Sequence, residues 1–129
     1  MTVPLIFEVP IKTENTLNMR GNTKLSMIMR HRKYAKNRDD AFMILNPRLQ
    51  ALRPSLVWPL VVTLTRLSSG HMDDDGIAAS CKGIRDAVAK ALGVNDGKRE
   101  RIRFVYDERK VRRGVYGVEV RIESAERRD

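Results

Sequence analysis

Apolar and polar residues alternate in several short stretches of the chain, which is the pattern of half-buried strands. Residues 5–10 alternate in this way and predict a first strand near a sheet edge. A second strand is predicted within Ser55–Leu67, a stretch rich in Val, Leu and Thr. Because Pro59 cannot donate a hydrogen bond to a sheet, the central part of this strand is expected to start at Leu60.

The C-terminal third shows the same alternation twice, in residues 101–106 and 116–123. The segment between the two stretches is strongly basic and contains Arg109, Lys110, Arg112, Arg113 and Gly114. Two strands separated by such a segment predict an antiparallel hairpin with a basic tip.

Helical spacing of apolar residues occurs in two places. A helix is expected from Lys24 to about Leu45, with Pro47 limiting its end. Its apolar face would contain Leu25, Ile28, Tyr34, Ala41, Phe42 and Leu45. A second helix after Gly76 carries one apolar stripe, formed by Ile77, Cys81, Ile84, Ala87, Val88, Ala91 and Leu92. Gly93 is well suited to end it.

The order strand, helix, strand, helix, strand, strand predicts one α+β domain over residues 1–129. We expect a mixed four-stranded sheet with the helices packed on one face. Trp58 is expected to be a core or interface anchor rather than a platform for base stacking. The single Cys81 is expected to pack in the core rather than to act as a reactive thiol.

The net charge of the chain indicates the kind of partner that it binds. The chain has 25 Lys and Arg against 16 Asp and Glu, a net charge of +9, so a polyanion is expected. No apolar run approaches a membrane span, and the N-terminus lacks a signal-peptide pattern. A soluble cytoplasmic protein is therefore expected, and nucleic acid is favoured over a membrane surface.

The first half of the 24–45 helix is basic and contains no acidic residue. It holds Lys24, Arg30, Arg32, Lys33, Lys36 and Arg38. Such a one-signed surface suits a phosphate backbone, although a charge run is often only a solvated face. In the preceding loop, Asn15, Asn18 and Arg20 are candidates for phosphate contacts, which turn geometry explains equally well.

Three consecutive carboxylates, Asp73 to Asp75, follow the second strand. In an extended chain Asp73 and Asp75 project to the same side. Clustered carboxylates favour Mg²⁺ or Mn²⁺, ions that also bind phosphate oxygens. The alternative is a solvated loop that caps the following helix. Asp96, in the turn after that helix, joins the cluster only if the turn folds back.

These acidic elements resemble those of the RusA-like Holliday-junction resolvases, particularly the shorter phage and prophage members. The matching segments are DDDG, the helix CKGIRDAVAKALG and the turn GVNDG, and the LNMRGN loop before a basic helix also looks like the family's N-terminal half. The resemblance covers nearly the whole chain. Gly76 stands where the family usually has Asn, and Asn95 where the first Asp of the closing pair is expected.

The resemblance implies a Mg²⁺-dependent homodimer, with Mn²⁺ a substitute, that nicks four-way DNA junctions during recombination and repair in a bacterial or phage-infected cell. Asp73, Asp75 and Asp96 would be the metal ligands and catalytic carboxylates. Lys82 would contact the scissile phosphate; otherwise it is an exposed partner of Asp86. The basic residues expected to hold the DNA are Arg20, Arg30, Arg32, Lys33, Lys36, Arg109, Lys110, Arg112 and Arg113.

Two other functions stay open. A non-cleaving protein that binds branched DNA on the same scaffold is consistent with Gly76 and with the charge, and an RNA-binding protein with the charge alone. No zinc-binding Cys/His set or phosphate loop is present in the sequence. His71 is expected to be a solvated loop residue.

Overall fold

The computed structural model describes residues 4–13, 24–72, 74–94 and 101–125. Its elements in chain order are β1 (Leu5–Val9), α1 (Lys24–Leu52), the short 3-10 helix η2 (Arg53–Ser55), β2 (Leu60–Ser68), α2 (Asp74–Ser80), α3 (Lys82–Leu92), β3 (Ile102–Lys110) and β4 (Gly117–Ser124). The four predicted strands are confirmed, and β2 begins at Leu60 as expected from Pro59.

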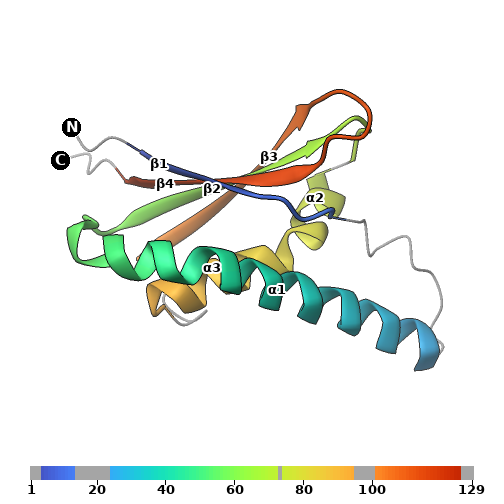
Figure 1. The fold of residues 1–129 in the computed structure, drawn as a ribbon, viewed down its shortest axis with the longest axis horizontal. Helices are drawn as coiled ribbons and strands as arrows, with labels where there is room; N and C mark the ends of the chain where they lie inside the picture. The colour runs from blue at the N-terminus through green and yellow to red at the C-terminus, as the bar shows by residue number, and fades with distance from the viewer. Residues whose placement is uncertain (1–3, 14–23, 73, 95–100, 126–129) are drawn as a thin grey trace.

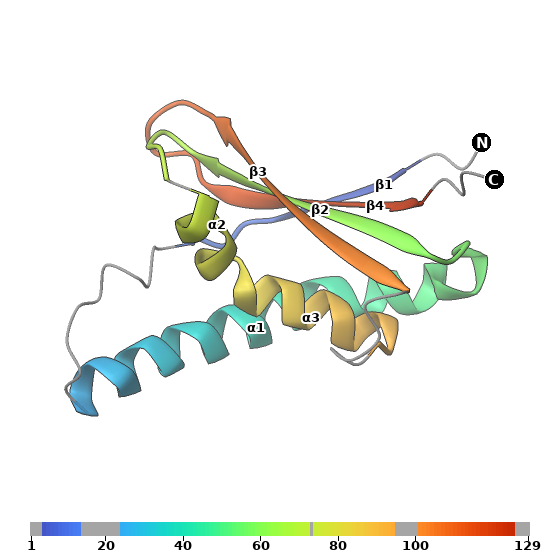
Figure 2. The same ribbon diagram turned by 180° about the vertical axis from the view of Figure 1, so that it is seen from behind.

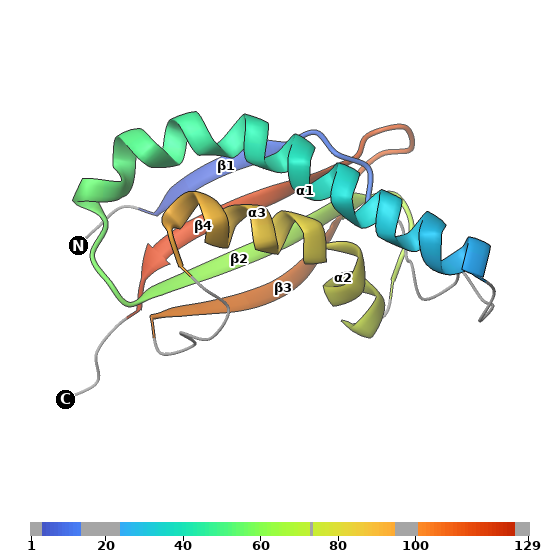
Figure 3. The same ribbon diagram turned by 90° about the horizontal axis from the view of Figure 1, so that it is seen from below.

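The strands form one mixed sheet in the order β1-β4-β2-β3 (Figure 1). Strand β2 runs parallel to β3, whereas β4 is antiparallel to both β1 and β2. Helices α1 and α3 lie side by side across one face of this sheet (Figure 3). The predicted single α+β domain, with a four-stranded mixed sheet and helices packed against it, is confirmed.

The predicted hairpin between the last two strands is wrong, because β2 lies between β3 and β4. Arg109 and Lys110 belong to β3 itself, so the connecting segment is shorter than expected. It crosses the end of β2, where the N–H of Val111 bonds to the carbonyl of Ser68 at 3.0 Å. The more apolar β2 takes the central position, where both of its edges are paired, while the charged β3 stays at the sheet edge.

The apolar stripe after Gly76 is confirmed as core: all seven of its residues are buried against the sheet and α1. Gly93 ends α3 in the left-handed conformation, with φ 73°. The single predicted helix is instead two helices that meet at Cys81 (Figure 2). The hydroxyl of Ser80 donates to the carbonyl of Ile77 at 2.9 Å at this junction, which is the kind of side-chain bond that bends helices.

Helix α1 departs from its prediction at both ends. It continues through Pro47 to Leu52, because the fully buried Leu45 and Leu49 continue its apolar face on either side of the exposed proline. This packing outweighs a backbone penalty of about 3 kcal/mol. At the other end, Leu25 and Ile28 are exposed rather than packed, since the start of α1 extends beyond the sheet (Figure 1).

Gly83 sets the closest approach of α1 and α3. A Cβ atom at this position would lie 2.9 Å from the backbone N of Arg38 and 2.9 Å from the carbonyl O of Tyr34. Only glycine allows the two backbones to come this close. The residue next to it, Lys82, is thereby held beside α1.

Candidate functional site

The acidic run lies shortly after β2, from which residues 69–72 separate it. Asp73 lies outside the described residues, and for Asp74 and Asp75 only the backbone is described, at the start of α2. Because α2 begins at Asp74, the prediction that Asp73 and Asp75 project to the same side of an extended chain does not hold. Successive residues of a helix instead point about 100° apart. The prediction that Asp73 and Asp75 act together stays a prediction.

Glu108 on β3 holds the chain just before Asp73. One of its carboxylate oxygens accepts hydrogen bonds from the backbone N–H of Met72 and from the Arg66 guanidinium, both at 3.1 Å. The other oxygen lies 2.9 Å from Nδ1 of His71. This carboxylate therefore fixes the backbone from which the acidic run departs, as a rigid strand end does for a ligand-bearing loop.

Arg66 completes the network beneath this segment. Its side chain is only 12% exposed and that of Glu108 15%, and its Nε also donates to the hydroxyl of the buried Thr13 at 3.2 Å. Sequence reasoning missed both residues. The available signal was a lone arginine inside an apolar strand, which requires a buried partner.

His71 agrees with its prediction as a solvated residue. Its side chain is 89% exposed, and its contact with Glu108 lies at the protein surface. The imidazole therefore sits on the outer side of the Glu108 network, next in sequence to Met72.

Lys82 is exposed at the start of α3, with its ammonium 5.2 Å above the centre of the Tyr34 ring on α1. The alternative role as the partner of Asp86 finds no support. Asp86 accepts hydrogen bonds from the Tyr34 hydroxyl and from Arg85. Burial, and then the Asp86 carboxylate, raise the pKa of Tyr34, so this hydroxyl remains a donor at neutral pH. The contact of Lys82 with the scissile phosphate stays a prediction.

Asp96 lies outside the described residues, but the residues that flank its segment are placed. The backbone carbonyl of Arg101 accepts a hydrogen bond from the N–H of Leu60 at the start of β2. The N–H of Val94 donates to the carbonyl of Ala89 at the end of α3. The start of β3 and the end of α3, which these residues adjoin, lie at the opposite end of the sheet from α2 (Figure 3). The 18 residues of α2 and α3 cover roughly 27 Å of helix, whereas two residues beyond Val94 reach about 7 Å.

The described residues therefore do not bring the two ends of the acidic segment together. Among them, no group of three or more His, Cys, Asp or Glu side chains is arranged to hold a metal ion. Of the predicted metal ligands, Asp73 and Asp96 lie outside the described residues, and only the backbone of Asp75 is described.

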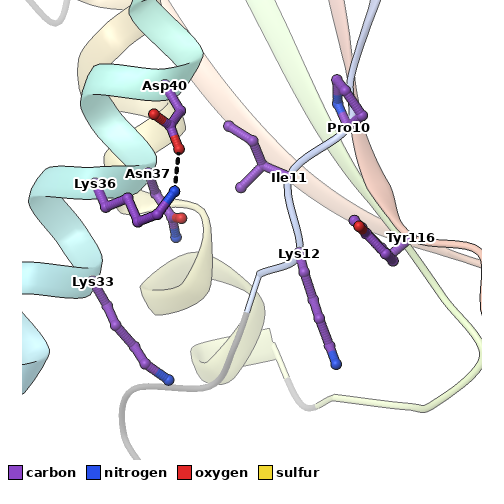
Figure 4. Close-up of a pocket in the computed structure, with 8 residues that line it drawn as sticks. All are labelled: Pro10, Ile11, Lys12, Lys33, Lys36, Asn37, Asp40 and Tyr116. Atoms are coloured by element: carbon purple, nitrogen blue, oxygen red, sulfur yellow. Dashed lines mark hydrogen bonds and ion pairs between the residues drawn. The ribbon is translucent and has the colours of Figure 1, made fainter.

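The predicted DNA-binding residues fall into separate groups. Arg20 lies outside the described residues. Lys33 and Lys36 line a groove between α1 and the segment after β1, together with Lys12 and Tyr116 (Figure 4). Lys36 also pairs with Asp40 at 2.7 Å. Of the rest of α1, Arg32 is exposed and Arg30 half-buried.

The remaining basic candidates lie at the far end of β3 and in the following segment. Lys110, Arg112 and Arg113 are exposed there. Arg109 instead points to the helix-free face of the sheet, where its guanidinium bonds to both carboxylate oxygens of Glu119 at 3.2 and 3.3 Å. The charge of Arg109 is thus partly neutralised by a carboxylate on β4, across the intervening strand β2.

Cys81 is fully buried, as predicted. Burial raises the pKa of its thiol to about 11, so it is protonated and unreactive at neutral pH. Trp58 is half-buried against the core, with the Arg101 guanidinium 4.7 Å above its ring, which agrees with a packing role.

Within the described part of the chain, no helix has both the length and the apolar character that crossing a bilayer requires. Neither a protein-family model nor a curated protein matches the chain.

Proposed function

We propose that this protein is a Mg²⁺-dependent endodeoxyribonuclease that resolves four-way DNA junctions by paired nicks. The chemistry comes from the carboxylates of the acidic run, with Lys82 at the scissile phosphate. Mg²⁺ bound by Asp73 and Asp75 would activate water and neutralise the developing charge. The resemblance to the RusA-like resolvases supplies this assignment.

The observation that supports it best is the anchoring of the acidic run. The run follows the central strand β2 after a four-residue connection, residues 69–72, and Glu108 holds the last of these residues, Met72, by its backbone N–H. Metal ligands need a backbone held within a few tenths of an ångström, which strand ends provide better than free loops. The Arg66–Glu108 pair lies beneath this anchor, with side chains that are only 12% and 15% exposed.

The distribution of basic residues supports a DNA substrate. Lys12, Lys33 and Lys36 line one groove, and Lys110, Arg112 and Arg113 are exposed at the end of β3. These cations come from the segment after β1, from α1, from the end of β3 and from the β3–β4 connection, and positive charge spread over several elements suits a polyanion.

The protein acts as a homodimer in this proposal. Val94 follows the end of α3, which lies at the end of the molecule opposite to α2 (Figure 3), and the two residues from Val94 to Asp96 span at most about 7 Å. We therefore infer that Asp96 acts with Asp75 of a second copy. A two-fold dimer supplies Asp96 of one copy to the acidic run of the other, and it also matches the near two-fold symmetry of the junction.

The second candidate is a non-cleaving protein that binds branched DNA. It is favoured by the separation of Val94 from α2 and by Gly76, which is buried in α2 where the resolvases usually carry an amide side chain. This candidate predicts tight binding to junctions without any cleavage product.

The test is incubation of purified protein with an end-labelled four-way junction and with a linear duplex of the same sequence. Each is assayed with Mg²⁺, with Mn²⁺ and with EDTA. Paired nicks in the junction that require metal support the nuclease. Binding of the junction without nicks in either metal supports the second candidate, and preference for structured RNA at matched salt contradicts both.

A further inference from the structure

Lys33 and Lys36 line a groove whose walls come from three separate segments of the chain. It has a volume of about 350 Å³ and lies between α1, the segment that follows β1, and the connection between β3 and β4. Figure 4 shows Lys33 and Lys12 on opposite walls, with both ammonium groups directed toward the same end of the groove. Tyr116 forms part of the wall beyond Lys12.

A second hollow continues the first. It has a volume of about 240 Å³ and shares Lys12 and Tyr116 with the groove, while Arg66, Ser68 and Arg113 line its other side. Ser68 is the last residue of β2, after which the chain leads to the acidic run. The two hollows therefore form one track from α1 to the end of β2, with Lys12 and Tyr116 at its midpoint.

The track is cationic and carries one accessible aromatic ring. Its lining holds five Lys and Arg residues and one carboxylate, Asp40. Asp40 neutralises Lys36, and Glu108 neutralises Arg66, so the net charge of the lining stays positive. Tyr116 is 49% exposed. A positive groove combined with an exposed aromatic side chain is the pattern of sites that bind single-stranded nucleic acid.

We propose that this track binds one unpaired DNA strand, with Lys12 and Lys33 on successive phosphates and Tyr116 stacked on a base between them. The first hollow is near the lower end of the roughly 300–1,000 Å³ range of small-molecule sites, so it fits a nucleotide unit of one strand rather than a double helix. The identity of the strand as DNA rests on the proposed function. Lys12 and Tyr116 are the binding residues that the sequence did not reveal.

The test measures fluorescence anisotropy of a short labelled single strand, and of the same strand as a splayed arm of a duplex, always in EDTA. Four variants are compared: Tyr116→Ala, Tyr116→Phe, Lys12→Gln and Lys90→Gln. Lys90 is the matched control, because it is exposed on α3 and lies over the Phe42 ring, outside the track. Far-ultraviolet circular dichroism checks that each variant is folded.

We expect Tyr116→Ala to weaken binding at least tenfold, because stacking on one base contributes about 1–3 kcal/mol, and Tyr116→Phe to bind like the wild type. Lys12→Gln should weaken binding several-fold and reduce the slope of log K against log salt by about 0.7. Lys90→Gln should leave both unchanged.

Wild-type affinity in Tyr116→Ala and Lys12→Gln would overturn the track, as would tighter binding of an RNA strand of the same sequence. Because no metal is present, these outcomes do not depend on cleavage. If the protein nicks junctions but the variants bind the strand like the wild type, the proposed function is supported and the proposed binding track is contradicted. If the protein never nicks but Tyr116→Ala and Lys12→Gln lose affinity for the strand as expected, the binding track is supported without the proposed nuclease activity.

Discussion

Arg66 and Glu108 lie opposite each other on the parallel strands β2 and β3, with Nη1 of the arginine 3.1 Å from Oε2 of the glutamate. Both side chains are largely buried, and the same carboxylate holds the backbone of Met72. The pair therefore links the sheet to the start of the acidic run. Removal of one charge leaves the other without its partner in a place that water barely reaches.

Replacement of Glu108 by Gln should lower the free energy of unfolding by about 2–3 kcal/mol, the cost of an impaired charged hydrogen bond at a mostly buried site. Urea unfolding followed by Trp58 fluorescence measures it. The matched control is Glu119→Gln, which removes the carboxylate that pairs with the 57% exposed Arg109. The control should lose less than about 1 kcal/mol, and equal losses in the two variants would contradict the structural role of Glu108.

Replacement of Gly83 by Ala should destabilise the packing of α1 on α3. The added Cβ lies 2.9 Å from two backbone atoms of α1, so one helix must move. The cost of such overpacking is about 1–3 kcal/mol and exceeds the gain of roughly 1 kcal/mol in helix propensity. The melting temperature of Gly83→Ala measures this loss of stability, and Gly70→Ala serves as the control.

At Gly70 a Cβ would meet only the Ser68 hydroxyl, at 3.9 Å. That control should stay within about 0.5 kcal/mol of the wild type. A stable Gly83→Ala protein with an unchanged melting temperature would show that the two helices are farther apart than described.

Alkaline pH should destabilise the protein in part through Cys81. Its thiol has a pKa raised from 9.0 to about 11 in the folded state, so the folded protein holds this proton more tightly than the unfolded chain. The resulting stability is complete below pH 9 and is lost as pH rises toward 11. Two pKa units correspond to about 2–3 kcal/mol.

Urea unfolding of the wild type and of Cys81→Ala at pH 8 and pH 10.5 measures this effect. Burial raises the pKa values of Tyr34 and Tyr106 in both proteins, and Cys81 adds a smaller contribution to that of Tyr106, so the difference between the two slopes reports the thiol and its effect on Tyr106. The alanine variant should lose less stability over this range. The same loss in both proteins would contradict a buried, protonated Cys81.

Local patterns predicted most of these elements because they depend on nearby residues. The stripe from Ile77 to Leu92 was recognisable because residues three and four apart share a helix face, and Pro59 marked the start of β2 because it cannot donate a hydrogen bond. Pro47 misled the prediction for α1, because packing of Leu45 and Leu49 against the core, which is a tertiary effect, outweighs the local penalty.

The features that sequence patterns did not reveal are non-local. Insertion of β2 between β3 and β4 depends on which strand buries the most apolar surface, whereas adjacency in sequence favoured the hairpin. Arg66 and Glu108 are 42 residues apart, and no spacing rule connects them. The track likewise joins Lys12, Lys33 and Tyr116 from three separate segments.

Mixing of two inactive variants tests the shared site that the homodimer implies. Asp75→Asn and Asp96→Asn should each abolish junction cleavage alone. If Asp96 of one copy acts with Asp75 of the other, a mixture allowed to exchange subunits forms dimers with one intact site and regains single nicks. Cleavage by an unmixed Asp96→Asn protein would contradict a role for Asp96, and no recovery after verified exchange would contradict the shared site.

The most direct test of the nuclease compares the wild type with Asp75→Asn and Asp74→Asn on an end-labelled four-way junction in Mg²⁺, with a gel shift of each protein in EDTA. Asp74 is the neighbouring carboxylate that the resemblance does not assign to the metal. We expect paired nicks from the wild type and from Asp74→Asn, a loss of at least about a hundredfold in Asp75→Asn from impaired metal binding, and equal binding by all three. Nicks of undiminished rate from Asp75→Asn, or binding without nicks from the wild type, would contradict a metal-dependent nuclease built on this acidic run.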